Sequence, residues 1–358
     1  MRLLVTGGSG FLGGFVLAEA ARRGHECVAL VRSSAAARRV ADLGATPLGG
    51  DLDDGAALAP TFAGARCDAL VNLASLGFGH AQGIIAAAVG ADLDRAVFVS
   101  TTAVTTTLPA RSKSVRLAAE ESIRSSPLKW TILRPTMIYG AAGDRNLSRL
   151  LALLARARRR LSPGGLPFVL PVPGGGGQLQ QPVHVADLAG AVLTAVDRPA
   201  AWTSCYDVAG PEPLPFAELV RASGAAIGCR VRVVPVPLAP VIAFARCCEL
   251  AGRRPGIRAE QWARLAEDKA FSVDAAARDL KYAPRPFAEG IREEAAALGL
   301  APASCRQPTS PDIPAEEPCL ALPRAPSPPS SAGACRCAAR PGCCSAPTPR
   351  RATGRTRP

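Results

Sequence analysis

Short apolar runs alternate with amphipathic stretches along the first 133 residues of the chain. Six of these runs predict strands: Arg2–Thr6, Glu26–Val31, Thr46–Leu48, Ala69–Leu73, Ala96–Ser100 and Trp130–Leu133. Between the first two runs, Leu12, Val16 and Ala20 recur four residues apart, and Gly24 follows as a helix stop. The alternation predicts repeated strand–helix units that build a parallel sheet.

The pattern becomes less regular after Gly140. It predicts an Arg-rich helix at Leu147–Arg160, a Gly/Pro loop at Pro163–Gly177 and a helix at His184–Val196. Later segments predict strands at Cys205–Val208 and Arg230–Val234, and helices at Pro215–Ser223, Val241–Ala251, Ala259–Glu267 and Phe287–Leu300. We therefore expect an α/β fold with a doubly wound parallel-sheet domain over residues 1–140, completed by a helix at 184–198, and a smaller mixed α/β substrate-side region over residues 141–300.

The last 58 residues, 301–358, differ in composition from the rest. They contain 13 Pro and six of the 12 Cys, but no Phe, Tyr, Trp or Val. Such a segment lacks the apolar surface needed to offset the entropy of ordering a chain, so we expect a disordered Pro-, Cys- and Arg-rich tail.

Neither group of cysteines is expected to hold a metal. Cys335, Cys337, Cys343 and Cys344 crowd together in the tail without a His, which suits a tetrahedral site poorly. The six cysteines before residue 301 lack metal-ligand spacing, and we expect them to be reduced residues of the core.

Charge and hydropathy limit the partners. The chain has 42 Lys+Arg against 29 Asp+Glu, but only four of these basic residues are Lys, which indicates a skewed composition rather than a nucleic-acid surface. No uncharged apolar run of about 18 residues predicts a transmembrane helix. Because Met1 leads directly into the apolar run Leu3–Val5, we expect no signal peptide and a cytoplasmic protein.

The most informative segment is Thr6-Gly7-Gly8-Ser9-Gly10-Phe11-Leu12-Gly13, at the turn from the first predicted strand into the first predicted helix. Gly7, Gly10 and Gly13 allow a tight turn, close approach to a pyrophosphate and close packing of helix on strand, while free helical N–H groups face the anion. Because the required strand and helix flank the motif, it predicts dinucleotide binding.

The motif resembles that of the extended short-chain dehydrogenase/reductase family, which carries Thr-Gly-x-x-Gly-x-x-Gly at this place. Over residues 1–300 the resemblance continues in Gly50-Asp51-Leu52, Asn72-Leu73-Ala74, Phe98-Val99-Ser100-Thr101, Arg134-Pro135-x-x-x-Tyr139-Gly140 and Val183-His184-Val185-x-Asp187-Leu188. It implies a Rossmann fold with Asp51 and Leu52 beside the adenine and Asn72–Ala74 along the ribose and nicotinamide. The alternative for these residues is a structural role only, as a strand-end cap and in ordinary sheet packing. The implied cofactor-binding residues are Gly7, Gly10, Phe11, Leu12, Gly13, Arg32, Ser33, Asp51, Leu52, Asn72, Ala74 and Ser100.

The choice of cofactor depends on the end of the second strand. An NAD site would place an acid there, on the ribose hydroxyls. This chain has Arg32-Ser33-Ser34 instead, and a guanidinium with two hydroxyls suits a 2′-phosphate, so NADP(H) is favoured over NAD(H). The alternative is that Arg32 packs over the adenine.

The sequence departs from the family at the catalytic positions. The resemblance implies a Tyr proton donor and a Lys four residues later. When Glu120 is aligned with the acidic residue that follows this Lys in the family, Ser112 stands at the Tyr position and Arg116 at the Lys position. No Tyr precedes Tyr139 in the chain. The catalytic positions are therefore Ser112 and Arg116, with Thr101 (or its neighbours Ser100 and Thr102) in the place of the family's third hydroxyl.

Three residues around the domain junction are expected to be structural. Tyr139 is predicted to be a packed aromatic residue, and the alternative is that it borders the substrate pocket. His184 and Asp187 open a helix, where an Asp suits the helix dipole, and the sequence shows no further His or carboxylate beside them for a metal or catalytic set.

An intact cofactor loop without the Tyr/Lys pair resembles the atypical extended members, which include epimerase/dehydratase-like proteins and proteins similar to the NADPH-binding accessory subunit of complex I. Three functions stay open. The first is an NADP(H)-dependent oxidoreductase acting on an unidentified small molecule. The others are a nucleotide-sugar epimerase or dehydratase, which would need a Tyr, and a non-catalytic interaction or assembly protein that bound NADPH stabilises. The substrate and the oligomeric state are not encoded in any motif.

Overall fold

The computed structural model describes residues 1–107, 111–144, 146–161, 166–251 and 267–302, all within one compact unit, Met1–Gln307. The expected tail from residue 303 on, with its clustered cysteines, lies outside the described residues. So does the helix expected at Ala259–Glu267, except for its last residue.

Seven parallel strands form the main sheet, in the order β11-β6-β5-β4-β1-β2-β3. They are β1 (Arg2–Thr6), β2 (Glu26–Val31), β3 (Thr46–Gly49), β4 (Ala69–Asn72), β5 (Arg95–Val99), β6 (Lys129–Pro135) and β11 (Ser204–Val208). The chain builds outward from β1 to β3 and then crosses to β4 on the other side of β1. In such sheets, ligands bind at this reversal, beyond the carboxyl ends of the strands. The predicted α/β class is confirmed.

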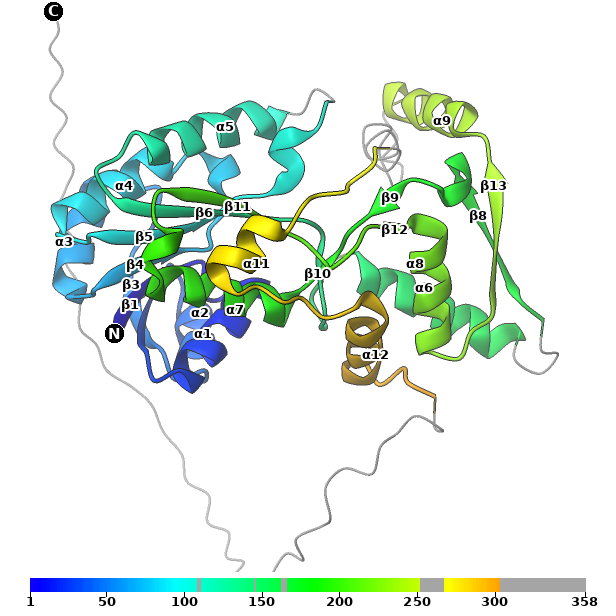
Figure 1. The fold of residues 1–358 in the computed structure, drawn as a ribbon, viewed down its shortest axis with the longest axis horizontal. Helices are drawn as coiled ribbons and strands as arrows, with labels where there is room; N and C mark the ends of the chain where they lie inside the picture. Colours follow the sequence, from blue (N-terminus) through cyan, green and yellow to red (C-terminus); the bar gives the residue numbers. More distant parts are fainter. Residues whose placement is uncertain (108–110, 145, 162–165, 252–266, 303–358) are drawn as a thin grey trace, which may run out of the picture. The chain divides into compact units, whose positions relative to one another are not determined.

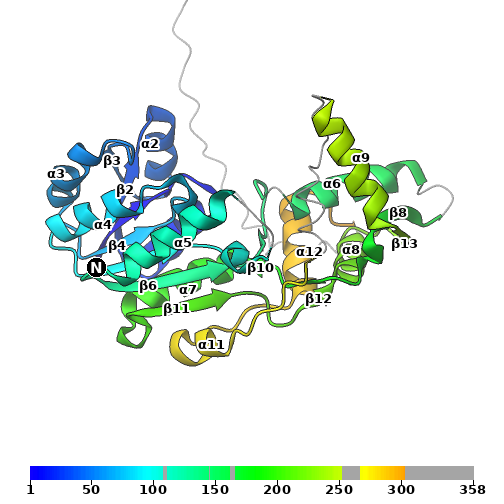
Figure 2. The ribbon, with the colours of Figure 1, turned by 90° about the horizontal axis from the view of Figure 1, so that it is seen from above.

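Helices cover both faces of the main sheet (Figures 1 and 2). One face carries α1 (Phe11–Arg22), α2 (Ser34–Ala41), α7 (Val185–Asp197) and α11 (Asp274–Leu280). The other carries α3 (Gly55–Ala65), α4 (Ala81–Gly90) and α5 (Arg111–Arg124). The short helices η1 (Leu76–Phe78), η2 (Thr102–Thr105) and η5 (Pro199–Ala201) lie in the connections. No helix in the described ranges is long and apolar enough to cross a bilayer.

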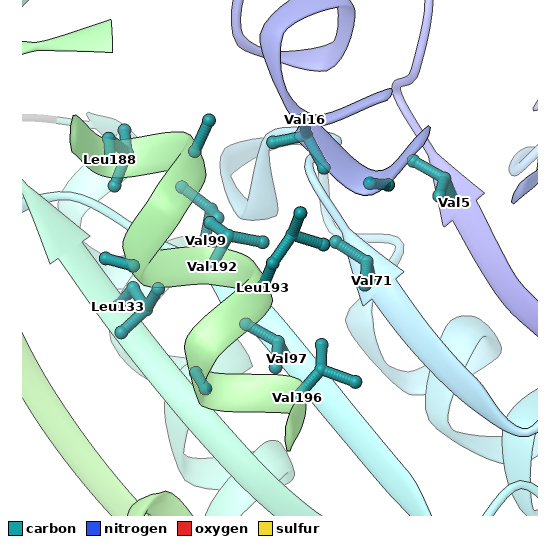
Figure 3. Close-up of a cluster of buried hydrophobic side chains, with 14 of the residues drawn as sticks. Val5, Val16, Val71, Val97, Val99, Leu133, Leu188, Val192, Leu193 and Val196 are labelled. Atoms are coloured by element: carbon teal, nitrogen blue, oxygen red, sulfur yellow. The ribbon is translucent and has the colours of Figure 1, made fainter. Parts of the chain in front are cut away.

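The core beneath α7 is aliphatic (Figure 3). Leu188, Val192 and Val196 recur four residues apart on α7, each at most 1% exposed, and pack toward side chains of the central strands such as Val97. Full burial of one such side chain contributes about 1.5–3 kcal/mol. This packing attaches α7 to the main sheet, as the sequence predicted.

Outside the main sheet and its helices, the described residues form three short strand pairs and four further helices. The pairs are β7 (Ile138–Tyr139) with β10 (Val183–His184), β8 (Phe168–Pro173) with β13 (Val231–Val236), and β9 (Leu179–Gln180) with β12 (Leu214–Pro215). The helices are α6 (Leu147–Leu161), α8 (Phe216–Ala226), α9 (Leu238–Leu250) and α12 (Phe287–Ala297), with the short η4 (Gly174–Gly176). Helices α6, α8 and α12 share a separate apolar cluster.

The structure adds two elements to the main sheet. The strand expected at Cys205–Val208 in the smaller region is β11, the edge strand beside β6. Helix α11, which the sequence pattern did not predict, packs against the same layer through Ala276 and Leu280. The predicted strands otherwise match to within two residues at each end, because each is bounded by local turn residues.

The six described cysteines are free, as expected, but not all are buried. Cys27 and Cys229 are core residues, and burial raises the pKa of both thiols. Cys247 is exposed on α9, where only Ala245 is buried, so the expectation of six core cysteines is wrong there.

Candidate functional site

The glycine loop forms a cradle in front of α1. Gly7 has φ +72°, and a Cβ there would lie 2.8 Å from the backbone nitrogen of Ala74. A Cβ at Gly13 would overlap the carbonyl oxygens of Gly7 and Gly8. Gly7 therefore requires glycine because the connection after β4 lies against it, and Gly13 because the glycine loop itself lies against the first turn of α1.

The N-terminus of α1 is left open to an anion. Gly10 is the N-cap and has no side chain that could bond the helical N–H groups, and the first turn of α1 contains no acidic residue. Phe11 and Leu12 begin the helix, partly buried. Unpaired N–H groups and the positive end of the helix dipole favour a phosphate group at this place. The cradle thus fits the pyrophosphate of a dinucleotide.

The end of β2 is basic, as expected, and a second arginine that sequence reasoning missed, Arg39, contacts the glycine loop. Arg32 is exposed and forms no hydrogen bond or ion pair with the described residues. Ser33 caps α2, since its Oγ accepts a hydrogen bond from Ala36 N at 3.3 Å. Arg39 Nη1 of α2 donates to Ser9 O of the glycine loop at 3.3 Å. No local pattern in the sequence indicated that Arg39 returns to the loop.

The residues expected beside the adenine lie in the turn after β3. Asp51 Oδ1 accepts a hydrogen bond from Asp53 N at 3.2 Å, so Asp51 stabilises this turn. Leu52 is partly buried and packs against the apolar cluster beneath α3 and α4. These two residues have clear structural roles, and their contact with a cofactor stays a prediction.

Asn72 holds together the carboxyl ends of β1 and β4. Its side chain is fully buried, accepts a hydrogen bond from Thr6 Oγ1 at 2.6 Å and donates to Ala74 O at 3.1 Å. The amide thereby fixes the segment that faces Gly7. Asn72 therefore shapes the cradle from within, whereas the backbone of Ala74 lies at its surface.

The three hydroxyl groups after β5 are engaged within the protein. Ser100 Oγ donates to Glu120 Oε1 at 2.7 Å, and Thr102 Oγ1 donates to Pro135 O at 3.3 Å. Thr101 Oγ1 accepts from Ala103 N at 3.2 Å and caps η2. Within the described part of the chain, only the Thr101 hydroxyl hydrogen lacks an acceptor among these three.

Ser112 and Arg116 meet on α5. Arg116 Nη1 donates to Ser112 Oγ at 2.5 Å. A Cβ on Gly77 of η1 would lie 3.1 Å from the guanidinium carbon, so Arg116 also packs against the connection after β4. The structure thus brings the two positions that the sequence predicts to be catalytic together, beside the connections that follow β4 and β5. Neither side chain can act as the family's Tyr or Lys.

Glu120 connects α5 to the sheet. It is fully buried and accepts hydrogen bonds from Ser100, from Arg134 Nη2 at 2.5 Å and from Arg124 Nη2 at 2.9 Å. Burial opposes ionisation, but the hydrogen bonds from Arg134 and Ser100 outweigh it and lower the pKa of Glu120. The carboxylate is therefore charged at neutral pH and holds the helix that carries Ser112 and Arg116.

Tyr139 is the buried junction residue that the sequence predicted. It is 1% exposed, packs edge-on against His184 at 5.3 Å and contacts Phe287, and burial raises its pKa. His184 Nε2 has no hydrogen-bond partner among the described residues, yet Glu293 Oε2 lies 3.8 Å away. Burial lowers the pKa of His184.

The expectation that no carboxylate lies near His184 and Asp187 is therefore wrong. Arg285, from the connection before α12, donates to Asp187 Oδ1 at 2.8 Å and also pairs with Glu293. No local pattern places α12 here, so sequence reasoning missed these groups. Their tight packing supports a structural role, and no cluster of metal-ligating residues occurs among the described residues.

A buried pair of carboxyl groups lies beside this junction. Glu294 of α12 is fully buried, and its Oε2 accepts a hydrogen bond from Gly140 N at 3.2 Å. Glu294 Oε1 and Asp144 Oδ2 are both buried without a partner among the described residues. Burial and the neighbouring Asp144 raise the pKa of Glu294 to about 9. A proton held between the two carboxyl groups gives each of them a partner.

Comparisons with known proteins agree with the geometry. Residues 7–150 match the family described as NAD(P)H-binding. A 4-hydroxy-2-methyl-3-oxo-4-farnesyl-3,4-dihydroquinoline-1-oxide ketoreductase from Stigmatella aurantiaca is 28% identical over 324 residues, which cover 80% of this chain and 92% of that protein. A 2-alkyl-3-oxoalkanoate reductase from Stenotrophomonas maltophilia is 28% identical over 338 residues, which cover 82% of this chain and 98% of that protein.

Solved structures show the same fold. A UDP-glucose 4-epimerase from Thermus thermophilus, in complex with NAD, has a TM-score of 0.62 and 23% identity, and the match covers 84% of this chain and 99% of the epimerase. At this identity the likeness concerns the fold alone. With the strand order and the glycine cradle, the match over residues 7–150 identifies an NAD(P)H-binding Rossmann-type fold, which is consistent with the resemblance to the extended short-chain dehydrogenase/reductase family.

Proposed function

We propose that this protein is an NADP(H)-dependent reductase that adds a hydride to the carbonyl group of a small molecule. The observation that carries the proposal is the hydroxyl–guanidinium pair of Ser112 and Arg116, which lies at the same edge of the sheet as the glycine cradle. Two relatives named as a ketoreductase and an oxoalkanoate reductase support it, since each aligns over at least 80% of this chain.

The described residues fit the cofactor. Gly7, Gly10 and Gly13 would hold its pyrophosphate at the N-terminus of α1. Arg32 and Ser33 would hold the 2′-phosphate, because a guanidinium binds phosphate through charge-assisted hydrogen bonds. When bound, such a cofactor supplies the hydride.

The chain's own groups would act on the carbonyl oxygen. Ser112 Oγ accepts its hydrogen bond from Arg116, and its own hydrogen has no acceptor among the described residues. This hydrogen can be donated to the substrate oxygen, where negative charge develops. Arg116 orients the hydroxyl and keeps a positive charge nearby, because a guanidinium stays protonated. Removal of one such donor typically lowers kcat by about 10²- to 10³-fold.

The absence of a Tyr at position 112 favours a second candidate, a non-catalytic protein that NADPH stabilises by mass action. An epimerase or dehydratase is not favoured, since it would need a Tyr general acid. The chain has three Tyr, and all are buried: Tyr139 is 1%, Tyr206 2% and Tyr282 7% exposed.

The test measures NADPH oxidation with a panel of ketones that includes 3-oxoalkanoates. Wild type should turn over at least one ketone. Gly10→Asp should abolish NADPH binding in calorimetry, because a carboxylate would sit against the pyrophosphate. Ser112→Ala should lower kcat by about 10²- to 10³-fold with unchanged NADPH affinity, whereas Ser122→Ala, partly exposed on the same helix and bonded to Ala118 O, should have no effect.

Two outcomes would contradict this function. NADPH binding that raises the melting temperature without turnover of any ketone would favour the non-catalytic candidate. Turnover of a nucleotide sugar by the wild-type protein would show that another group performs the proton transfer of an epimerase.

A further inference from the structure

The proposed reduction needs a proton as well as a hydride. Hydride addition to a carbonyl carbon leaves negative charge on the oxygen, and an acid must neutralise it. Ser112 is a much weaker acid than a phenol, and Arg116 cannot release a proton at neutral pH. The two residues at the Tyr and Lys positions therefore polarise the oxygen but do not protonate it.

The tyrosines cannot supply this proton, because each is engaged elsewhere. Tyr206 Oη donates to Asp279 Oδ2 at 3.1 Å, and Tyr282 Oη donates to Ala209 O at 2.8 Å. Tyr139 is enclosed between His184 and Phe287 at the junction. The tyrosines are therefore not available as acids at this edge of the sheet.

Lys113 is an acid of a different kind, and it directly follows Ser112. It lies in the first turn of α5, which begins at the carboxyl edge of the sheet because the helix follows the connection after β5. Lys113 Nζ donates to Thr106 O of that connection at 2.5 Å, and the side chain is half-buried. No carboxylate among the described residues forms an ion pair with Lys113, so its charge is not neutralised there.

Glu267 holds the connection after β5 that carries Thr106, the hydrogen-bond acceptor of Lys113. Glu267 accepts hydrogen bonds from Thr106 Oγ1 at 2.5 Å, from Thr107 Oγ1 at 2.8 Å and from Thr107 N at 3.0 Å. These three bonds fix the backbone that carries the Thr106 carbonyl. Lys113 is thereby held in one position, as a group that transfers a proton must be.

The other three lysines of the chain lie elsewhere. Lys129 pairs with Asp94 at 2.6 Å and lies over the ring of Trp202. Lys269 donates to Gln180 Oε1, and Lys281 is exposed after α11. All four lysines are described, so Lys113 is the single ammonium group in the first turn of α5.

We propose that Lys113 is the proton donor of this reduction, an inference that rests on the proposed function. As hydride transfer forms the new C–H bond, the π electrons of the carbonyl move to oxygen, and the Lys113 ammonium passes one proton to that oxygen. The products are an alcohol and a neutral amine, which takes a proton from water.

Two variants separate proton transfer from positioning. Lys113→Arg keeps the positive charge and a donor for Thr106 O but cannot release a proton, and Lys113→Met removes both. We expect both variants to bind NADPH as wild type does, to lose about 10²- to 10⁴-fold in kcat and to lose the alkaline limb of the pH profile of kcat. Lys129→Met is the matched control and should behave as wild type. A Lys113→Arg enzyme with wild-type kcat and pH profile would overturn the proposal, because a structural cation would then suffice.

A second measurement needs no substrate. Four lysines give few signals after reductive methylation with ¹³C-formaldehyde, and Lys113→Arg assigns the signal of Lys113. Saturating NADP⁺ should shift this signal, since the oxidised nicotinamide ring is cationic, while the Lys129 signal stays in place. A Lys113 signal that does not respond would overturn the proposal, even if the wild-type enzyme reduces ketones. A responding signal in a protein that reduces no ketone would overturn the proposed function, and the proton-donor role with it.

Discussion

Replacement of the buried Glu294 by glutamine should make the protein more stable at neutral and alkaline pH. Asp144 and burial raise the pKa of Glu294 to about 9, whereas its ordinary value is 4.5. Between these values the folded chain keeps a proton that the unfolded chain releases. The stability associated with this group is therefore complete at the acidic end, falls as the pH rises through this window and becomes constant above about pH 9.

The size of the effect follows from the number of protons released. One proton per unfolding event changes the free energy of unfolding by about 1.4 kcal/mol per pH unit. Between about pH 6 and about pH 8, the titration of Glu294 should lower the free energy of unfolding of the wild-type protein by about 2.7 kcal/mol. Glu294→Gln removes this dependence, since an amide does not titrate. Its oxygen can still accept from Gly140 N, and its NH₂ can donate to Asp144.

Urea denaturation at several pH values within this window measures the difference. The free energy of unfolding of Glu294→Gln should exceed that of wild type by an amount that grows with pH at about 1.4 kcal/mol per unit. Glu289→Gln, exposed on the same helix, is the matched control and should leave the wild-type slope in place. If the difference between Glu294→Gln and wild type does not change with pH, the two carboxyl groups do not share a proton and the reasoning fails.

Three further substitutions test the cradle and its supports. Gly13→Ala should lower the stability by about 1–3 kcal/mol through overpacking and weaken NADPH binding, while Gly14→Ala, whose Cβ would have its nearest contact at 3.7 Å, should be tolerated in thermal melts. Arg32→Asp should weaken NADPH about ten- to a hundredfold more than NADH, and an unchanged affinity ratio in calorimetry would place the preference elsewhere. Glu120→Ala should lower the free energy of unfolding in urea denaturation, by up to about 3 kcal/mol, because the partly buried guanidinium of Arg134 then lacks its carboxylate partner, whereas Glu121→Ala, on the exposed side of α5, should cost little.

Local sequence was sufficient for the strands of the main sheet and for the glycine cradle. The apolar runs of β1, β2 and β4 are bounded by turn residues only a few positions away, so adjacent residues carry their whole signal. The same holds for Gly7, Gly10 and Gly13, since a strand, a tight turn and a helix start follow one another within 12 residues, 2–13. The meeting of Ser112 with Arg116 was likewise predictable from helical spacing, because residues four apart lie on one face.

Distant contacts could not be derived in this way. Thr106 and Glu267 are 161 positions apart, and Gly140 and Glu294 are 154 apart. A single sequence shows the charge of Glu267 or Glu294 but not which backbone it will meet, because that depends on how α12 and its preceding segment pack. The register of β11 beside β6 depends on the same packing, which is why this strand was assigned to the smaller region.

For the site, too, the sequence alone predicted the cofactor, whereas the environment of Lys113 depended on the tertiary structure. The order of motifs was enough to predict a dinucleotide, because phosphate recognition uses backbone N–H groups from one continuous segment. The environment of Lys113 required the folded chain, since an ammonium group becomes a candidate acid only through its neighbours. The neighbour in contact is the Thr106 carbonyl, and the connection that carries it is held by Glu267, which only tertiary packing brings there.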